Sequence, residues 1–166
     1  MKFSNICLLH GLGGSPKGSV NLLQKALEPV FPNSEFIRPL LPHNDYKIEK
    51  PEKSVKFLED LDIPKSSLLI GISLGGLVAA KLQEESRPDL YVICISSPTR
   101  FKTIALKKKM SHRVVFYSSE DEIIADRVSN WSELAEAHDL PWLNHDTDLH
   151  IPKLIKLIQK YTNKLS

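Results

Sequence analysis

Short apolar runs alternate along the chain with longer segments in which hydrophobic residues recur at helical spacing. The runs predict strands, because they are too short for helices and are bounded by glycine, proline or polar residues. We expect strands at 6–9, 35–38, 67–70, 90–95 and 113–117, and a short sixth strand at 142–143. The fourth run is almost entirely apolar, which is typical of parallel strands that are covered on both faces.

The segments between these runs predict helices. They lie from Ser15 to about residue 29, at 52–61, at 74–85, around 128–135 and over the last dozen residues. The first helix is expected to begin with Ser15 as its cap and proline at its first helical position. Strands that alternate with helices predict an α/β fold: a three-layer sandwich with a mostly or wholly parallel sheet of about six strands. At 166 residues, the chain is expected to form a single domain over 1–166.

Composition excludes several classes of protein. Hydrophobic residues make up 42% of the chain and the net charge is +2, so a nucleic-acid partner is not expected. The lysine run 107–109 is interpreted as solvated surface. The chain has no apolar run of 18 residues, so we expect no membrane span, and we see no signal peptide. Cys7 and Cys94 lie in separate apolar runs, as reduced buried thiols do, which favours a cytoplasmic location.

Ser73 lies at the junction of an apolar run and a helix-forming run, within Gly71-Ile72-Ser73-Leu74-Gly75. A serine on a sharp strand-to-helix turn presents its hydroxyl as a nucleophile at the edge of a sheet. Gly71 and Gly75 would allow neighbouring backbone to pass close to that turn. The alternative interpretation is a serine that only caps the helix.

A glycine-rich loop, His10-Gly11-Leu12-Gly13-Gly14, follows the first predicted strand. Such a loop beside a nucleophile can supply a backbone N–H to a developing oxyanion, and the helix that follows Ser73 can supply another from Leu74. The alternative is a phosphate-binding or plain tight turn. However, the loop contains neither a Walker lysine-serine pair nor Gly-x-Gly-x-x-Gly.

Asp121 follows the fifth predicted strand, where a carboxylate could orient a histidine. Glu120 and Glu122 are nearby substitutes, and a solvated acidic turn is the alternative. We prefer Asp121 because the two isoleucines that follow Glu122 would anchor the turn with the Asp121 side chain pointing inward.

Two histidines near the C-terminus could be the base that faces Ser73. We prefer His150, because it leaves room for a full strand before the loop, whereas His145 leaves the more usual loop length before the final helix. The remaining histidines at 43, 112 and 138 are expected at the surface.

These features together resemble the α/β-hydrolase superfamily over essentially the whole chain: HGLGG after a strand, the GISLGG turn, and Ser, Asp and His in that order. The resemblance implies that Leu12 and Leu74 supply the oxyanion N–H groups and that His10, Gly11, Gly71 and Gly75 support them. It also implies a small enzyme without a lid, because no insertion for a cap domain separates the fourth and fifth strands. No metal or organic cofactor is expected.

The expected function is a serine hydrolase that cleaves an ester or related acyl bond of a small-molecule substrate through an acyl-enzyme. Two other functions remain open on the sequence. One is a catalytically inactive binding or scaffold protein with this fold, and the other is an acyltransferase or thioesterase that uses the same residues. The sequence does not indicate the acyl length or the oligomeric state.

Overall fold

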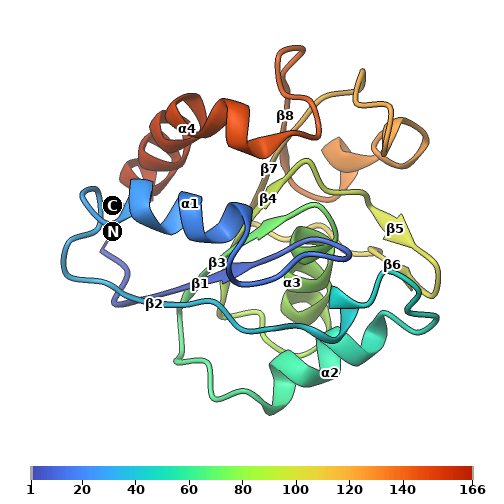
Figure 1. The fold of residues 1–166 in the computed structure, drawn as a ribbon, viewed down its shortest axis with the longest axis horizontal. Helices are drawn as coiled ribbons and strands as arrows, with labels where there is room; N and C mark the ends of the chain where they lie inside the picture. Colours follow the sequence, from blue (N-terminus) through green and yellow to red (C-terminus); the bar gives the residue numbers. More distant parts are fainter. Residues whose placement is uncertain (1, 166) are drawn as a thin grey trace.

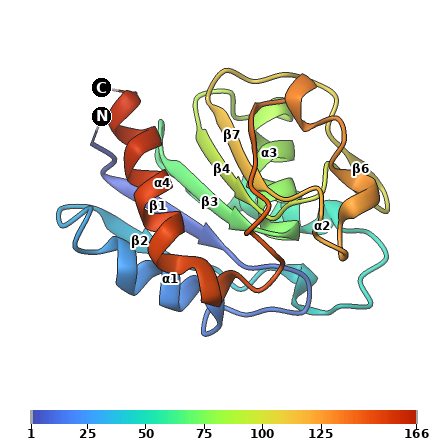
Figure 2. The ribbon, with the colours of Figure 1, turned by 90° about the horizontal axis from the view of Figure 1, so that it is seen from above.

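Six parallel strands form one twisted sheet in the computed structural model, which describes residues 2–165. From one edge to the other, the strands are β2 (Glu35–Ile37), β1 (Asn5–Leu9), β3 (Leu68–Ile72), β4 (Tyr91–Ile95), β7 (Arg113–Tyr117) and β8 (Glu136–Asp139). Helices α1 (Ser19–Leu27) and α4 (Ile151–Lys164) cover one face, and α2 (Glu52–Asp60) and α3 (Leu74–Glu85) cover the other (Figures 1 and 2). The three-layer α/β sandwich with a parallel sheet is therefore confirmed.

The sheet divides the hydrophobic core into two layers. Leu69 packs in the layer beneath α2 and α3, whereas its neighbours Leu68 and Ile70 pack in the layer beneath α1 and α4. All three side chains are fully buried, because both faces of the central strands are covered. This double burial explains why the central strands show apolar runs and no alternation with polar residues.

The sixth strand differs from the sequence prediction. It is β8, which pairs with β7 between Val114 and Glu136 and continues to Tyr117 and Asp139. The predicted run at 142–143 follows β8 in a turn, where Leu143 is buried. An edge strand keeps one side and much of its surface in water, so β8 forms from polar residues that carry no hydrophobic signal.

The predicted helix around 128–135 is also different. The segment forms two short 3-10 helices, η2 (Ala125–Arg127) and η3 (Trp131–Glu133). Its apolar residues Val128, Trp131 and Leu134 are buried as expected. Their spacing of three residues suits the 3-10 helix, in which side chains at i and i+3 eclipse one another.

The first helix begins three residues later than predicted, with Gly18 in place of Ser15 as its N-cap. The Ser15 hydroxyl accepts the N–H of Lys17 at 3.2 Å and the Ser15 carbonyl accepts that of Gly18 at 3.3 Å. These bonds close a turn, and α1 starts after it at Ser19.

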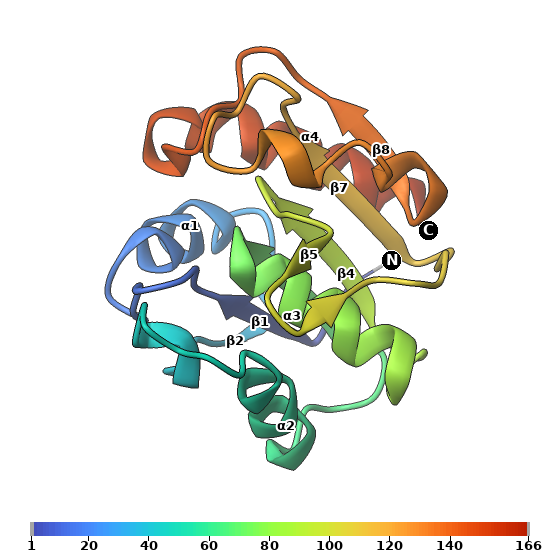
Figure 3. The ribbon, with the colours of Figure 1, turned by 90° about the vertical axis from the view of Figure 1, so that its right-hand side faces the viewer.

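A small antiparallel hairpin, β5 (Arg100–Phe101) with β6 (Ile104–Ala105), lies between β4 and β7 in the chain. Figure 3 shows it beside α3, away from the main sheet. The hydrophobic pattern does not predict this hairpin, because each strand has only two residues and so shows no alternation. It brings Phe101 to the edge of the site described below.

The surface and the cysteines agree with the sequence interpretation. The lysines of the 107–109 run are exposed. Cys7 and Cys94 are buried and unpaired, and burial raises the pKa of both thiols to about 12. None of the helices within residues 2–165 combines the length and apolarity that crossing a bilayer requires.

Candidate active site

Ser73 occupies a strained turn at the carboxyl end of β3. Its backbone has φ +53° and ψ −122°, a left-handed conformation that is uncommon for a residue with a side chain. Its N–H donates to the carbonyl of Ile95 on β4 at 2.8 Å. The turn is tight enough that a Cβ on Gly75 would lie 2.3 Å from the carbonyl oxygen of Leu9. The glycines of the motif therefore allow β1, β3 and α3 to meet behind the serine.

His145 and Asp121 complete a hydrogen-bonded chain with this serine. His145 Nε2 lies 3.0 Å from Ser73 Oγ, and His145 Nδ1 lies 2.8 Å from Asp121 Oδ2. Donation from Nδ1–H to the carboxylate leaves Nε2 free to accept the serine hydroxyl proton. The Asp121 side chain is buried, and its Oδ1 also accepts the N–H of Ile123 at 3.0 Å. Glu120 and Glu122, the alternative acids, are exposed.

The structure contradicts the preference for His150 as the histidine that faces Ser73. His150 Nε2 lies 2.9 Å from Asn144 Oδ1, and its ring packs against Trp142 at the start of α4. The chain reaches the site earlier than expected because β8 ends at Asp139. The loop after β8 therefore crosses the strand ends at His145, before the 3-10 helix η4 (Thr147–His150). The usual length of the loop before the last helix was the sequence signal that favoured His145.

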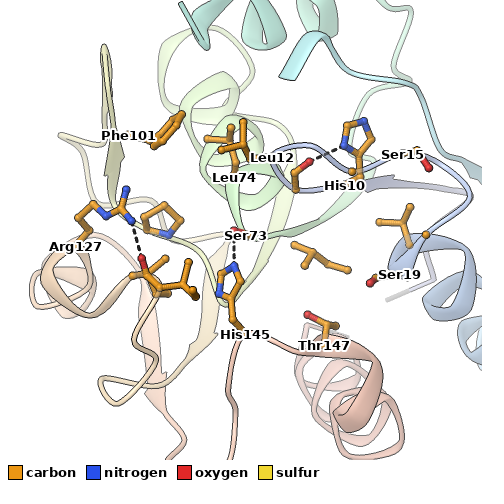
Figure 4. Close-up of a pocket in the computed structure, with 18 residues that line it drawn as sticks. His10, Leu12, Ser15, Ser19, Ser73, Leu74, Phe101, Arg127, His145 and Thr147 are labelled. Atoms are coloured by element: carbon orange, nitrogen blue, oxygen red, sulfur yellow. Dashed lines mark hydrogen bonds between the residues drawn. The ribbon is translucent and has the colours of Figure 1, made fainter. Parts of the chain in front are cut away.

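The glycine-rich loop after β1 passes directly beside the serine. A Cβ on Gly11 would lie 3.3 Å from the Cβ of Ser73. In Figure 4, Ser73 lies between His145 on one side and Leu12 and Leu74 on the other. Within residues 2–165, the N–H groups of Leu12 and Leu74 have no hydrogen-bond acceptor, whereas that of Gly13 donates to a carbonyl. Two unpartnered donors near Ser73 fit the expected oxyanion site.

Two buried histidines hold this loop in place. His10 Nδ1–H donates to the Gly11 carbonyl at 2.8 Å, and its Nε2 accepts the N–H of Leu41 at 2.9 Å. His43 Nε2–H donates to the His10 carbonyl, and its Nδ1 accepts the Ser54 hydroxyl, both at 2.8 Å. His43 is thus fully buried, and its predicted surface position is wrong. Nothing in the sequence around it indicated a partner, because Ser54 comes from α2.

The pH dependence of stability follows from His43. Burial lowers its pKa from 6.5 to about 4, and burial also lowers the pKa of His10. Well above pH 6.5 both histidines are neutral in the folded and the unfolded chain, so their contribution to stability is complete. As pH falls from 6.5 to 4 the unfolded chain takes up the proton first, and His43 alone lowers the free energy of unfolding by about 3 kcal/mol.

Urea unfolding measured at several pH values between 7.5 and 4 checks this prediction. His43→Gln removes the titrating group. The free energy of unfolding should therefore fall less steeply with decreasing pH, because unfolding of the variant takes up about one proton fewer. An unchanged slope in the variant would contradict the assignment.

An open pocket of about 480 Å³ surrounds Ser73 (Figure 4). Its walls come from the loop after β1, the first turn of α1, the β4–β5 connection and the loop that carries His145. The loop after β7 that carries Asp121, here called the acid loop, completes them. The lining residues are His10, Gly11, Leu12, Gly14, Ser15, Gly18, Ser19, Val20, Ile72, Ser73, Leu74, Pro98, Phe101, Ile123, Ile124, Arg127, His145 and Thr147. Across residues 2–165, no three His, Cys, Asp or Glu side chains are grouped as metal ligands would be.

Solved structures similar to this chain share its fold. MGS-MChE2, an α/β hydrolase enzyme from the metagenome of lagoon sediments at Mar Chica, Morocco, superposes with a TM-score of 0.73 at 16% identity, over 98% of this chain and 92% of that one. The mouse α/β hydrolase domain-containing protein 10 superposes with a TM-score of 0.71 at 17% identity, over 99% of this chain and 92% of that one. XC6422 from Xanthomonas campestris is described as a serine hydrolase without a lid. It superposes with a TM-score of 0.66 at 13% identity, over 96% of this chain and 82% of that one.

No protein-family model and no curated protein sequence matches the chain. The structural similarity at these low identities establishes the fold. The chain has the fold of the α/β-hydrolase superfamily in a small form. Within residues 2–165, the β5–β6 hairpin is the only regular structure between β4 and β7.

Proposed function

We propose that this protein is a serine hydrolase that cleaves a carboxylic ester or a related acyl bond of a small molecule. The observation that carries the proposal is the continuous hydrogen-bonded chain from Ser73 through His145 to Asp121 at the edge of an open pocket. A serine is a weak nucleophile at neutral pH, and a histidine oriented by a carboxylate is a common way to activate it.

In the proposed reaction, Ser73 Oγ attacks the substrate carbonyl while His145 Nε2 takes the hydroxyl proton. The N–H groups of Leu12 and Leu74 stabilise the resulting oxyanion. His145 then returns the proton to the leaving alcohol, which leaves an acyl group on Ser73. Water, deprotonated by the same histidine, attacks the acyl-enzyme and releases the acid.

Asp121 has a separate task in this scheme. Its buried carboxylate holds His145 in the tautomer with a proton on Nδ1 and stabilises the imidazolium that forms during each step.

Acyl transfer to another acceptor or thioester cleavage would use the same groups. The two unpaired buried cysteines suit a reducing compartment, which supports a cytoplasmic location.

Covalent labelling with a fluorophosphonate probe tests the proposal. The folded wild-type protein should react with one equivalent of probe at Ser73, and it should hydrolyse short-chain aryl esters. Ser73→Ala should abolish both. Failure of the folded wild-type protein to react would favour a non-catalytic binding protein with this fold.

A further inference from the structure

One residue dominates the charge of the pocket wall. Arg127 carries a permanent positive charge, and none of the described residues that line the pocket is an aspartate or a glutamate. It lies on the same side of Ser73 as Phe101, opposite Ser19 and Thr147 (Figure 4). A pocket wall with one sign of charge favours a ligand of the other sign.

Most of the hydrogen-bonding capacity of this guanidinium is unused. It has five N–H donors, and among residues 2–165 only Nη2 has an acceptor, the carbonyl of Ile123 at 2.7 Å. Nε is buried and has no hydrogen-bond partner. The Asp126 carboxylate lies 3.5 Å from Nε, but that side chain is 80% exposed, so the ion pair is weak.

The backbone of Arg127 is held from two sides. Its carbonyl accepts both the N–H and the hydroxyl of Thr99, at 2.8 and 3.0 Å, and its own N–H donates to the Ile124 carbonyl at 2.8 Å. Thr99 lies just after β4, and Ile124 belongs to the acid loop. The guanidinium therefore extends from a fixed position in the wall.

The surroundings of the guanidinium strengthen its interaction with an anion. Pro98, Phe101, Ile123 and Ile124 line the same part of the pocket and are apolar. Charges attract one another more strongly beside such residues than in bulk water. A planar guanidinium with free donors also matches the two oxygens of a carboxylate.

We propose that Arg127 binds a carboxylate of the substrate. The preferred substrates are then esters in which a short apolar chain separates a carboxylate from the scissile bond. This inference rests on the proposed serine hydrolase function. It assigns Arg127 to substrate selection and leaves the chemical step to Ser73, His145 and Asp121.

The test compares kcat/KM for matched pairs of esters. One series sets monomethyl esters of succinate, glutarate, adipate and suberate against methyl esters of monocarboxylic acids with the same chain, so that the carboxylate is on the acyl side. A second pair, para-acetoxybenzoate and its methyl ester, places the carboxylate on the alcohol side. The wild-type enzyme should prefer the carboxylate member in at least one series, and high salt should reduce that preference.

Arg127→Gln should lower this preference by about tenfold to a hundredfold, the effect of losing a hydrogen-bonded charge. Arg127→Lys should retain part of it, because the charge remains and the planar fork is lost. Arg100→Gln is the matched control: Arg100 contacts the Asp126 carbonyl but lines a neighbouring hollow instead of this pocket, so the ratio should not change.

The ratio of kcat/KM for the carboxylate ester to kcat/KM for its neutral partner decides the outcome. If Arg127→Gln leaves the ratio unchanged in every series, the inference is wrong, even if both rates fall together. Absence of Ser73-dependent hydrolysis of every ester would instead contradict the proposed function. Hydrolysis of the neutral esters without an Arg127-dependent preference would overturn this inference alone.

Discussion

Replacement of His145 by alanine is expected to lower kcat for a short-chain aryl ester by at least about 10³-fold, because among residues 2–165 it is the one base hydrogen-bonded to the Ser73 hydroxyl. His150→Ala should leave kcat within a fewfold of wild type, since its ring contacts Asn144 and Trp142 and not the serine. Steady-state kinetics of the two variants, with circular dichroism to confirm folding, make the comparison.

The same site predicts non-additive losses. The double variant Ser73→Ala/His145→Ala should be about as slow as either single variant, because the two groups act in one proton transfer. Asp121→Asn should also reduce kcat strongly, because an amide can present its N–H to Nδ1 and so favour the wrong tautomer of His145. A large loss in His150→Ala with normal turnover in His145→Ala would refute the assignment.

Gly71→Ala is expected to reduce the free energy of unfolding by more than about 3 kcal/mol and to abolish turnover. The added Cβ would lie 2.3 Å from the backbone carbon of Gly75 and from the backbone nitrogen of Gly76. Both atoms belong to the first turn of α3, so relief of the clash must displace the helix that begins beside Ser73. Urea unfolding followed by tryptophan fluorescence measures the loss.

Gly18→Ala is the matched control for this effect on stability. The nearest atom to its new Cβ is the Ser15 carbonyl oxygen at 3.7 Å, an ordinary contact, so the substitution adds no clash with the fold. Its backbone, at φ −88° and ψ −135°, lies outside the main regions of a residue with a side chain, so alanine adds only local backbone strain. The free energy of unfolding should fall by about 1 to 2 kcal/mol, less than in Gly71→Ala. Equal stability of the two variants would show that the turn at Ser73 tolerates a larger residue than its geometry indicates.

The local sequence determined the central part of this fold. Strands such as 91–95 are buried on both faces and must be apolar throughout, so they can be recognised without knowledge of their neighbours. The turn at Ser73 is local in part: Gly71 is required by the turn itself, since a Cβ there would meet the backbone of Gly75 and Gly76, whereas Gly75 is required by its close approach to the end of β1. The polar edge strand β8 lacked such a signal, since an edge strand has little surface to bury.

The partners of Ser73 were decided by tertiary structure. A carboxylate, an imidazole and a hydroxyl from three separate loops meet only when the strand ends are in register, and a shift of a few residues in β8 changes which histidine arrives. The sequence therefore determined the position of Ser73 and of the glycines around it. Only the packed sheet selected His145 over His150, buried His43 behind the glycine loop and brought Arg127 to the pocket, because those contacts join residues far apart in the chain.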